Sequence, residues 1–374
     1  MEDINKYLNK QKLNIATVFS GIGAFEHALK KDGIDYNVIF ACDNGERELN
    51  VTEEKIKENI SKNKMNTQEV KEYVDGLYKR LKKPNYVEQT YKANYDVNND
   101  SFYQDIRFLD GKNYKNKIDL YVGGSPCQSF SISGHRKGLD DARGTLFYEY
   151  ARLVKEIEPK VFIYENVPGM LNHDGGKTWE IISGIFDSLG YEWKLFKLKA
   201  TDYGIPQNRT RIFVVGFKKE FNIDLDNFEI PKIELKTEMK DYLETNVDEK
   251  YYYKEKGFKW ITKPKSLEKR VSINSKITRT QAANQQFNWC GDMVFEEKPK
   301  RKFQDNVYYG EYQGKIGVAR KLTPRECLRL MGYDDDFNIV IPDKEMYRQS
   351  GNSIVVNVMQ AIVESVIRTG VFDE

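Results

Sequence analysis

The chain has 374 residues, of which 40% are hydrophobic and 31% charged, with a formal net charge of +2. No stretch approaches the roughly 20 apolar residues of a membrane span, and the opening Met1–Asn5 has no signal-peptide form, so we expect a cytoplasmic protein. The four scattered cysteines indicate neither a disulfide framework nor a thiolate zinc site, and three histidines give little support to metal catalysis.

Residues 13–45 read as strand, glycine-rich turn, helix and strand, the opening of a doubly wound α/β sheet. The turn contains Gly21 and Gly23, where the backbone can approach a ligand, and the second strand ends at Asp43, which can accept hydrogen bonds from a ribose. The pattern favours an adenosine-type ligand. A dinucleotide and S-adenosylmethionine both fit it.

Residues 46–90 are charged and helix-prone, and we expect an inserted helical hairpin. Mixed charge of this kind usually marks a solvated helical face, and contact with DNA is the alternative.

Cys127 lies in a Gly/Ser/Pro-rich stretch, residues 123–131, directly after the apolar run 118–122. A thiol on such a turn, at the carboxyl end of a buried strand, is placed where open α/β sheets bind ligands, and its thiolate would be a strong nucleophile. The alternative is a small apolar residue that fills the strand end. Spacing alone does not decide between the two.

The α/β alternation continues to about residue 217, with helices expected at 146–156 and 178–189 and strands at 161–164 and 211–216. Residues 222–318 differ, because Lys and Arg are interleaved with Tyr and Trp and no βα alternation is visible. This texture predicts a separate small domain. Its basic and aromatic residues suit nucleic-acid contact, or else they serve packing and solubility.

Five segments now stand in one order: Phe19-Ser20-Gly21-Ile22-Gly23, Pro126-Cys127-Gln128, Glu165-Asn166-Val167, Gln207-Asn208-Arg209-Thr210-Arg211 and Gly351-Asn352-Ser353. This arrangement resembles the cytosine-C5 DNA methyltransferases of bacterial or phage restriction-modification type. The likeness covers most of the chain outside residues 46–90 and 222–318.

The resemblance implies a Rossmann-like S-adenosylmethionine-dependent methyltransferase sheet with a smaller target recognition domain. On this basis residues 1–219 form the catalytic domain, 222–318 recognise the target, and 319–374 return to the catalytic domain. Duplex DNA is the implied substrate and S-adenosylhomocysteine the second product. We expect a monomer, with any cognate restriction endonuclease acting separately.

The resemblance also assigns the chemistry. Cys127 would add to carbon 6 of a cytosine flipped out of the duplex, which makes carbon 5 nucleophilic. Glu165 would act at N3 and the exocyclic amine, which requires burial to raise its pKa. Arg211 matches the residue that reaches O2, and Arg209 would be a second cationic contact.

For the cofactor, the resemblance implies packing on adenine by Phe19 and ribose binding by Asp43, which stands where the family usually has Glu. The remaining contacts would come from Gly21, Gly23, Asp105, Ile106, Leu146, Asn352 and Ser353. A mobile loop with Gln128, Ser131 and Ser133 would close over the flipped base. Candidate readers of the DNA sequence are Arg279, Gln281 and Gln285, because Arg favours guanine and Gln favours adenine.

Two rival functions keep the fold. A tRNA cytosine-C5 methyltransferase is disfavoured by the second domain, a segment of roughly 100 residues with interleaved basic and aromatic side chains, which suits a duplex groove better than an RNA loop. A non-catalytic DNA-binding protein would be expected to have lost Cys127, Glu165 or Arg211, and all three are present.

Overall fold

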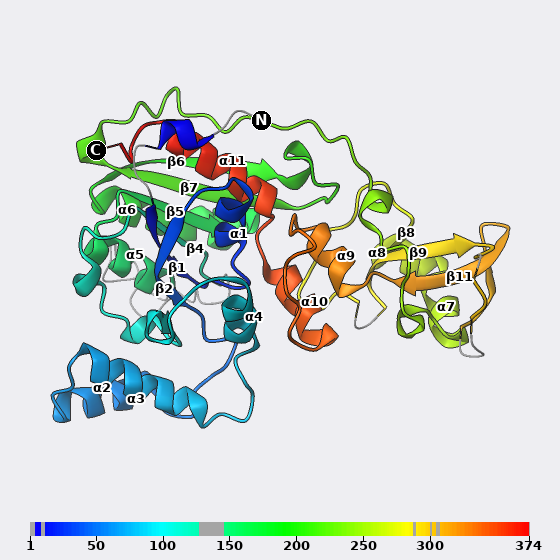
Figure 1. Ribbon diagram of the computed structural model, residues 1–374, viewed down its shortest axis with the longest axis horizontal. Helices are drawn as coiled ribbons and strands as arrows, with labels where there is room; N and C mark the ends of the chain where they lie inside the picture. The colour runs from blue at the N-terminus through cyan, green and yellow to red at the C-terminus, as the bar shows by residue number, and fades with distance from the viewer. Residues whose placement is uncertain are drawn as a thin grey trace. The chain divides into compact units, whose positions relative to one another are not determined.

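The computed structural model describes residues 4–8, 12–126, 146–286, 289–299, 301–303 and 307–373. The chain divides into two compact units, whose elements are labelled in Figure 1. The first unit comprises Met1–Leu198, Thr210–Pro231 and Gln360–Glu374, and the second comprises Lys199–Arg209 and Lys232–Met359.

A seven-stranded sheet forms the centre of the first unit, in the order β3-β2-β1-β4-β5-β7-β6. Strands β1 to β5 pair in parallel, and β7 runs antiparallel to β5. The order reverses between β1 and β4, and ligands of such sheets bind at the carboxyl ends of the strands beside this switch. The expected α/β fold is confirmed. The strands are β1 (Leu13–Val18), β2 (Tyr36–Cys42), β3 (Phe102–Tyr103), β4 (Leu120–Gly123), β5 (Val161–Asn166), β6 (Tyr191–Lys199) and β7 (Thr210–Lys218).

Helix α5 shows how apolar spacing attaches a helix to this sheet. Phe147, Tyr150, Ala151 and Val154 follow the i, i+3, i+4, i+7 rule and are fully buried in the core. The Phe147 ring packs edge-on against Tyr164 of β5, with ring centroids 5.3 Å apart. The other helices of the core are α1 (Ala24–Lys31), α4 (Tyr86–Asn94), α6 (Lys177–Ser188) and α11 (Val356–Ile367), with α5 at Leu146–Ile157.

The insertion at residues 46–90 holds two complete helices, α2 (Glu53–Lys62) and α3 (Thr67–Lys79), which lie side by side in Figure 1, and the start of α4. Ile56, Val74 and Tyr78 are buried between them in a small apolar cluster. Most of the lysines of the insertion are exposed, as a solvated face requires. The hairpin therefore has one inward face and one charged outward face.

The second unit is built on a four-stranded sheet in the order β10-β11-β9-β8. Beside it, Arg320 and Glu326 form a buried pair with two contacts of 2.8 Å, and the Glu326 carboxylate also accepts from the Thr323 N–H that begins α9. The strands are β8 (Val271–Ile273), β9 (Gly291–Glu297), β10 (Gly310–Tyr312) and β11 (Lys315–Lys321), and the helices are α7 (Glu255–Ile261), α8 (Pro264–Lys269), α9 (Pro324–Arg329) and α10 (Asp343–Asn352).

The units divide the chain differently from the expected domains. Strand β11 crosses the expected boundary at residue 318 and continues its pairing with β9 as far as Lys321↔Met293. Residues 319–359 are therefore grouped with the second unit, and only Gln360–Glu374 return to the first. The short segment Lys199–Arg209 also belongs to the second unit, although the sequence placed it in the catalytic domain.

Candidate active site

An ion pair stands at the carboxyl end of β5. The Arg211 Nε lies 3.0 Å from the Glu165 Oε1, and the two side chains are 18% and 16% exposed. Because β7 runs antiparallel to β5 with Glu165 opposite Phe213, the start of β7 and the end of β5 meet at one edge of the sheet. The structure thus brings together two residues that the sequence assigned to one reaction centre.

The segment that leads into Cys127 packs tightly against this pair. A Cβ on Gly124 would lie only 2.7 Å from the Glu165 Oε2 and 2.9 Å from its carbonyl oxygen. The Ser125 hydroxyl shares a 2.7 Å hydrogen bond with the Tyr164 hydroxyl, and the Asn166 amide donates to the Ser125 carbonyl at 3.0 Å. Residues 124 and 125 are therefore fixed beside Glu165. Cys127 follows two residues later and lies outside the described residues, as do Gln128, Ser131 and Ser133.

Two of the described cysteines have no access to such chemistry. Cys42 and Cys327 are buried, and burial is the main reason that the pKa of each thiol is well above its usual value. A thiol held in its neutral form is a poor nucleophile. These two cysteines are core residues, whereas Cys290 is partly exposed.

The glycine-rich turn after β1 needs its glycines. Gly21 and Gly23 have φ angles of +54° and +72°, and a Cβ on Gly23 would lie 2.1 Å from the Tyr95 ring. The Gly21 N–H donates to the Asp43 Oδ2 at 3.0 Å, and the Gly45 N–H donates to Oδ1 at 2.8 Å. Asp43 therefore fastens the turn to the end of β2. Burial raises its pKa above the usual value despite these bonds.

Asp105 follows β3 and begins the short 3₁₀ helix η3 (Ile106–Phe108). Its Oδ1 accepts from the Arg107 backbone N–H and Nε, and its Oδ2 accepts from the Tyr78 hydroxyl and the Arg107 Nη2. Ile106 is buried, and Phe19 and Leu146 are half-buried against the same core cluster.

The predicted cofactor residues of the first unit thus follow neighbouring strands. Phe19 comes directly after β1, Asp43 directly after β2, and Asp105 two residues after β3. Since parallel strands end at the same edge of a sheet, these side chains share the edge at which a ligand is expected.

Arg209, Asn352 and Ser353 belong to the second unit. Asn352 is exposed at the end of α10, and the Ser353 hydroxyl shares a 2.8 Å hydrogen bond with the Tyr333 hydroxyl. The Arg209 guanidinium is 3% exposed and donates to the carbonyls of Gln281 at 2.8 Å, Gly351 at 3.1 Å and Ser353 at 2.5 Å. These bonds hold together three segments of the second unit. This structural role differs from the cationic contact near the cytosine that was expected from the sequence.

Two of the three expected base readers are interior residues. Gln281 and Gln285 are 3% and 5% exposed; the Gln281 amide donates to the Cys327 carbonyl at 3.0 Å and the Gln285 amide to the Gln281 Oε1 at 2.9 Å. A base contact would require these buried bonds to break, so the structure does not favour it. Arg279 is exposed, and its guanidinium donates to the Lys269 carbonyl at 3.0 Å.

The comparisons with known proteins identify the family. The family model for C-5 cytosine-specific DNA methylase matches residues 13–368. The chain belongs to this family. Among its relatives, the Type II methyltransferase M1.ScrFI of Lactococcus lactis subsp. cremoris is 35% identical over 75% of this chain and 69% of the relative. M.SsoII of Shigella sonnei is 36% identical over 76% of this chain and 72% of the relative.

Solved structures confirm the methyltransferase fold. The Dnmt2 methyltransferase of S. pombe matches 95% of this chain and 98% of its own with a TM-score of 0.62 at 19% identity. A Spodoptera frugiperda DNMT2 mutant matches 95% and 99% with a TM-score of 0.65 at 18% identity. The chain is therefore a DNA (cytosine-5-)-methyltransferase of the kind found in restriction-modification systems. No helix in the part of this methyltransferase that the structure describes is long and apolar enough to cross a membrane.

The edge after β1, β2 and β3 has the chemistry that S-adenosylmethionine, the methyl donor of this family in general, requires. The carboxylates of Asp43 and Asp105 are acceptors that suit ribose hydroxyls and the adenine amine. Phe19 and Ile106 supply apolar surface for a ring, and the glycine turn leaves room that a side chain would fill. These residues fit the cofactor.

Proposed function

We propose that this methyltransferase binds S-adenosylmethionine at the edge after β1, β2 and β3 and modifies a cytosine held between Cys127 and the Glu165–Arg211 pair. The observation that carries the proposal is the ion pair itself, with its 3.0 Å contact directly beside residues 124 and 125, which lead into Cys127. A nucleophile, a carboxylic group and a cation at one sheet edge are the groups that addition to a pyrimidine ring requires.

In this mechanism the Cys127 thiolate forms a bond to carbon 6, and the electron pair of the broken double bond makes carbon 5 nucleophilic. Glu165 donates a proton to N3, which neutralises the charge that the attack places on the ring. Arg211 orients Glu165 through its Nε and brings its positive charge to O2. When bound, S-adenosylmethionine supplies the methyl group that carbon 5 acquires. Loss of the carbon 5 proton to solvent then allows the sulfur to leave, and the N3 proton returns to Glu165, which restores the ring.

For the cofactor we assign the ribose hydroxyls to Asp43, the adenine amine to Asp105, and the faces of the adenine to Phe19, Ile106 and Leu146. Asn352 and Ser353 are assigned to the cofactor by resemblance alone, and S-adenosylhomocysteine is the product released. The support is the chemistry of these side chains and their position after neighbouring strands.

For DNA we propose that residues 222–318 select the target sequence, with Arg279 the one expected reader that is exposed. Gln128, Ser131 and Ser133 would lie in the loop that closes over the flipped base. We further propose that the enzyme acts as a cytoplasmic monomer, with a cognate restriction endonuclease acting separately.

Covalent trapping tests this mechanism. Fluorine at carbon 5 cannot leave as a cation, so a duplex with 5-fluorocytosine at the target should hold the enzyme in a denaturation-resistant complex when S-adenosylmethionine is present. Cys127→Ser should form no such complex, because a hydroxyl is far less acidic than a thiol. Cys290→Ser is the matched control and should trap as the unaltered chain does. Equal trapping by Cys127→Ser, or ready methylation with no trapping by the unaltered chain, would overturn the mechanism.

A further inference from the structure

We propose that the insertion at residues 46–90 positions the two cofactor carboxylates, Asp43 and Asp105, and so sets the affinity for S-adenosylmethionine. The inference rests on the proposed function, since it takes these carboxylates as cofactor ligands. The sequence predicted a solvated face for this insertion, with contact with DNA as the alternative. The almost fully buried polar side chains of the insertion include Arg47 and Asn85, both at 6% exposure, and Tyr78 at 1%.

Asn85 holds the segment of Asp43. Its Nδ2 donates to the Asp43 carbonyl at 2.8 Å and to the Gln104 Oε1 at 3.0 Å. Its Oδ1 caps helix α4 by accepting from the N–H groups of Val87 and Glu88, both at 3.1 Å. The Asn85 amide thus has two separable roles: its Nδ2 holds the segment of Asp43, and its Oδ1 caps helix α4.

Tyr78, on helix α3, holds Asp105. Its hydroxyl donates to the Asp105 Oδ2 at 2.9 Å. Burial, followed by the neighbouring Asp105 charge, raises the pKa of Tyr78, so the hydroxyl keeps its proton and remains a donor. A hydrogen bond from a buried hydroxyl to a carboxylate is a strong constraint on the direction of that carboxylate.

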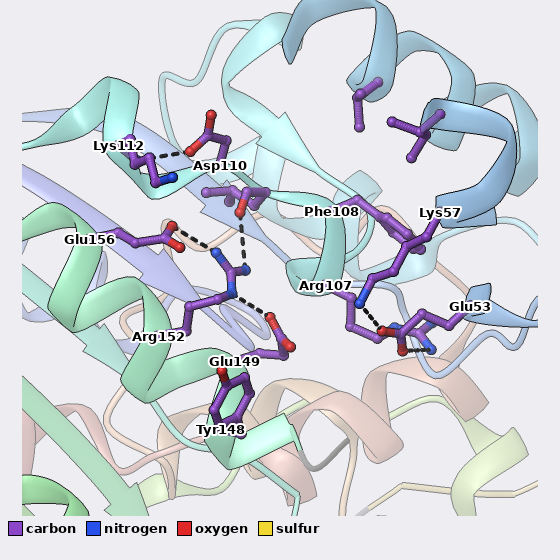
Figure 2. A pocket seen from close by; sticks show the side chains of 13 residues that line it. Glu53, Lys57, Arg107, Phe108, Asp110, Lys112, Tyr148, Glu149, Arg152 and Glu156 are labelled. Carbon is purple, nitrogen blue, oxygen red and sulfur yellow. Dashed lines mark hydrogen bonds and ion pairs between the residues drawn. The ribbon is translucent and has the colours of Figure 1, made fainter. Parts of the chain in front are cut away.

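Helix α2 reaches the same carboxylate through Arg107. Arg107 contacts Asp105 at 2.6 Å through its Nη2, and its Nη1 lies 3.4 Å from the Glu53 Oε2. Figure 2 shows Arg107 and Glu53 turned toward each other. The Lys57 Nζ lies 2.6 Å from the Glu53 Oε1. These three residues line a cavity of about 720 Å³ that α5 residues such as Arg152 also line. Both helices of the insertion therefore act on Asp105.

Arg47 links the two carboxylate segments. Its Nε donates to the Asn44 carbonyl at 2.7 Å, directly after Asp43, and its Nη2 bonds the side chain of Gln104, directly before Asp105. Gln104 in turn donates to the Glu88 Oε2 at 2.8 Å. The buried polar network thus joins residues 43–44 to residues 104–105 through side chains of the insertion. Tyr78, Asn85 and Arg47 are positioning residues, since they act through the carboxylates.

Asn85→Asp separates the two jobs of Asn85. Aspartate caps a helix as well as asparagine does, so α4 keeps its cap, but the donor to the Asp43 carbonyl and to the Gln104 Oε1 is lost. We expect the dissociation constant of S-adenosylhomocysteine, measured by calorimetry on the full chain, to rise roughly tenfold. The KM for S-adenosylmethionine should rise to match, while kcat at saturating cofactor and the methylated sequence stay unchanged. Asn66→Asp is the matched control, because Asn66 caps α3 in the same insertion and has no contact with either carboxylate segment among the described residues.

Tyr78→Phe provides a second, independent variant, with Tyr73→Phe on the same helix as its control. Weaker binding of S-adenosylhomocysteine by Tyr78→Phe, with unchanged binding by Tyr73→Phe, supports the positioning role. Unchanged binding in both Asn85→Asp and Tyr78→Phe overturns it, and tighter binding with Tyr78→Phe would show that the hydroxyl competes with the ligand for Asp105 and overturns it as well. Failure of the unaltered chain to bind S-adenosylhomocysteine would instead refute the proposed cofactor site itself.

Discussion

Replacing Gly124 with alanine perturbs Glu165 without altering a single reactive group. The added Cβ would lie 2.7 Å from the Glu165 Oε2, so this oxygen must retreat by about 0.7 Å to reach the 3.4 Å of an ordinary contact. The carbonyl oxygen of the same residue, at 2.9 Å, blocks the simplest relief, since it belongs to the backbone of β5. A misplacement of about 1 Å at a reacting centre costs on the order of 10²-fold in rate, so we expect kcat to fall roughly 10- to 100-fold, or about 1.4 to 2.7 kcal/mol.

Single-turnover methylation of a target duplex measures this effect directly, with S-adenosylhomocysteine binding measured in parallel. Binding should be unchanged, because Gly124 has no part in the proposed cofactor site. Gly184→Ala in helix α6 is the control: no neighbouring atom lies within 4 Å of the position that its Cβ would take, and alanine in a helix should stabilise the chain by roughly 0.5 to 1 kcal/mol with no loss of rate. A Gly124→Ala enzyme with full kcat would refute the placement of Glu165 at the reacting centre.

Two further predictions follow from the described contacts. Arg209→Lys should lower the free energy of unfolding by about 2 kcal/mol in urea titrations, because lysine cannot reach three carbonyls at once. Arg211→Lys should instead abolish most of the methylation rate with little change in stability. The reverse pattern would contradict both assignments. Burial raises the pKa of Asp32 to about 6, and its Oδ2 is buried with no hydrogen-bond partner among the described residues. Ionisation of Asp32 therefore destabilises the fold increasingly as the pH rises from about 4 to 6, and Asp32→Asn should stabilise the chain by about 1 kcal/mol at pH 8, after allowance for partial exposure, and by little at pH 4. Equal gains at both pH values would exclude this cause.

The sequence grouped together several residues that the structure places close to one another. Glu165 and Arg211, 46 positions apart, were expected to serve one reaction, and the antiparallel pairing of β5 and β7 brings them into contact. Phe19, Asp43 and Asp105 were likewise expected near one ligand, and they follow adjacent strands of one sheet. Only Asp43 was expected from the strand–turn pattern itself, which fixes the edge of the sheet on which the last residue of a strand lies. The assignments of Glu165 and Arg211 came from the resemblance to the methyltransferase family.

Burial and long-range contacts were beyond the same reasoning. Gln281 and Gln285 have the side chains that read adenine, but residue type does not reveal that both amides lie in the interior. Tyr78 and Asn85 reach carboxylate segments 27 and 42 residues away, and no local pattern encodes such a partner. For this reason a clean deletion of residues 46–90, which the mixed charge presents as harmless, should cost cofactor affinity.

The buried cysteines also make this enzyme suitable for site-specific labelling. Cys42 and Cys327 are shielded from solvent and their thiols stay protonated, so alkylating dyes should not react with them at neutral pH. Among the described cysteines only Cys290 would then compete with Cys127 for the dye. A Cys290→Ser chain would retain Cys127 as its one cysteine besides the two buried ones. Because a maleimide would consume the proposed nucleophile, slower labelling of that chain in the presence of DNA would report that DNA covers Cys127.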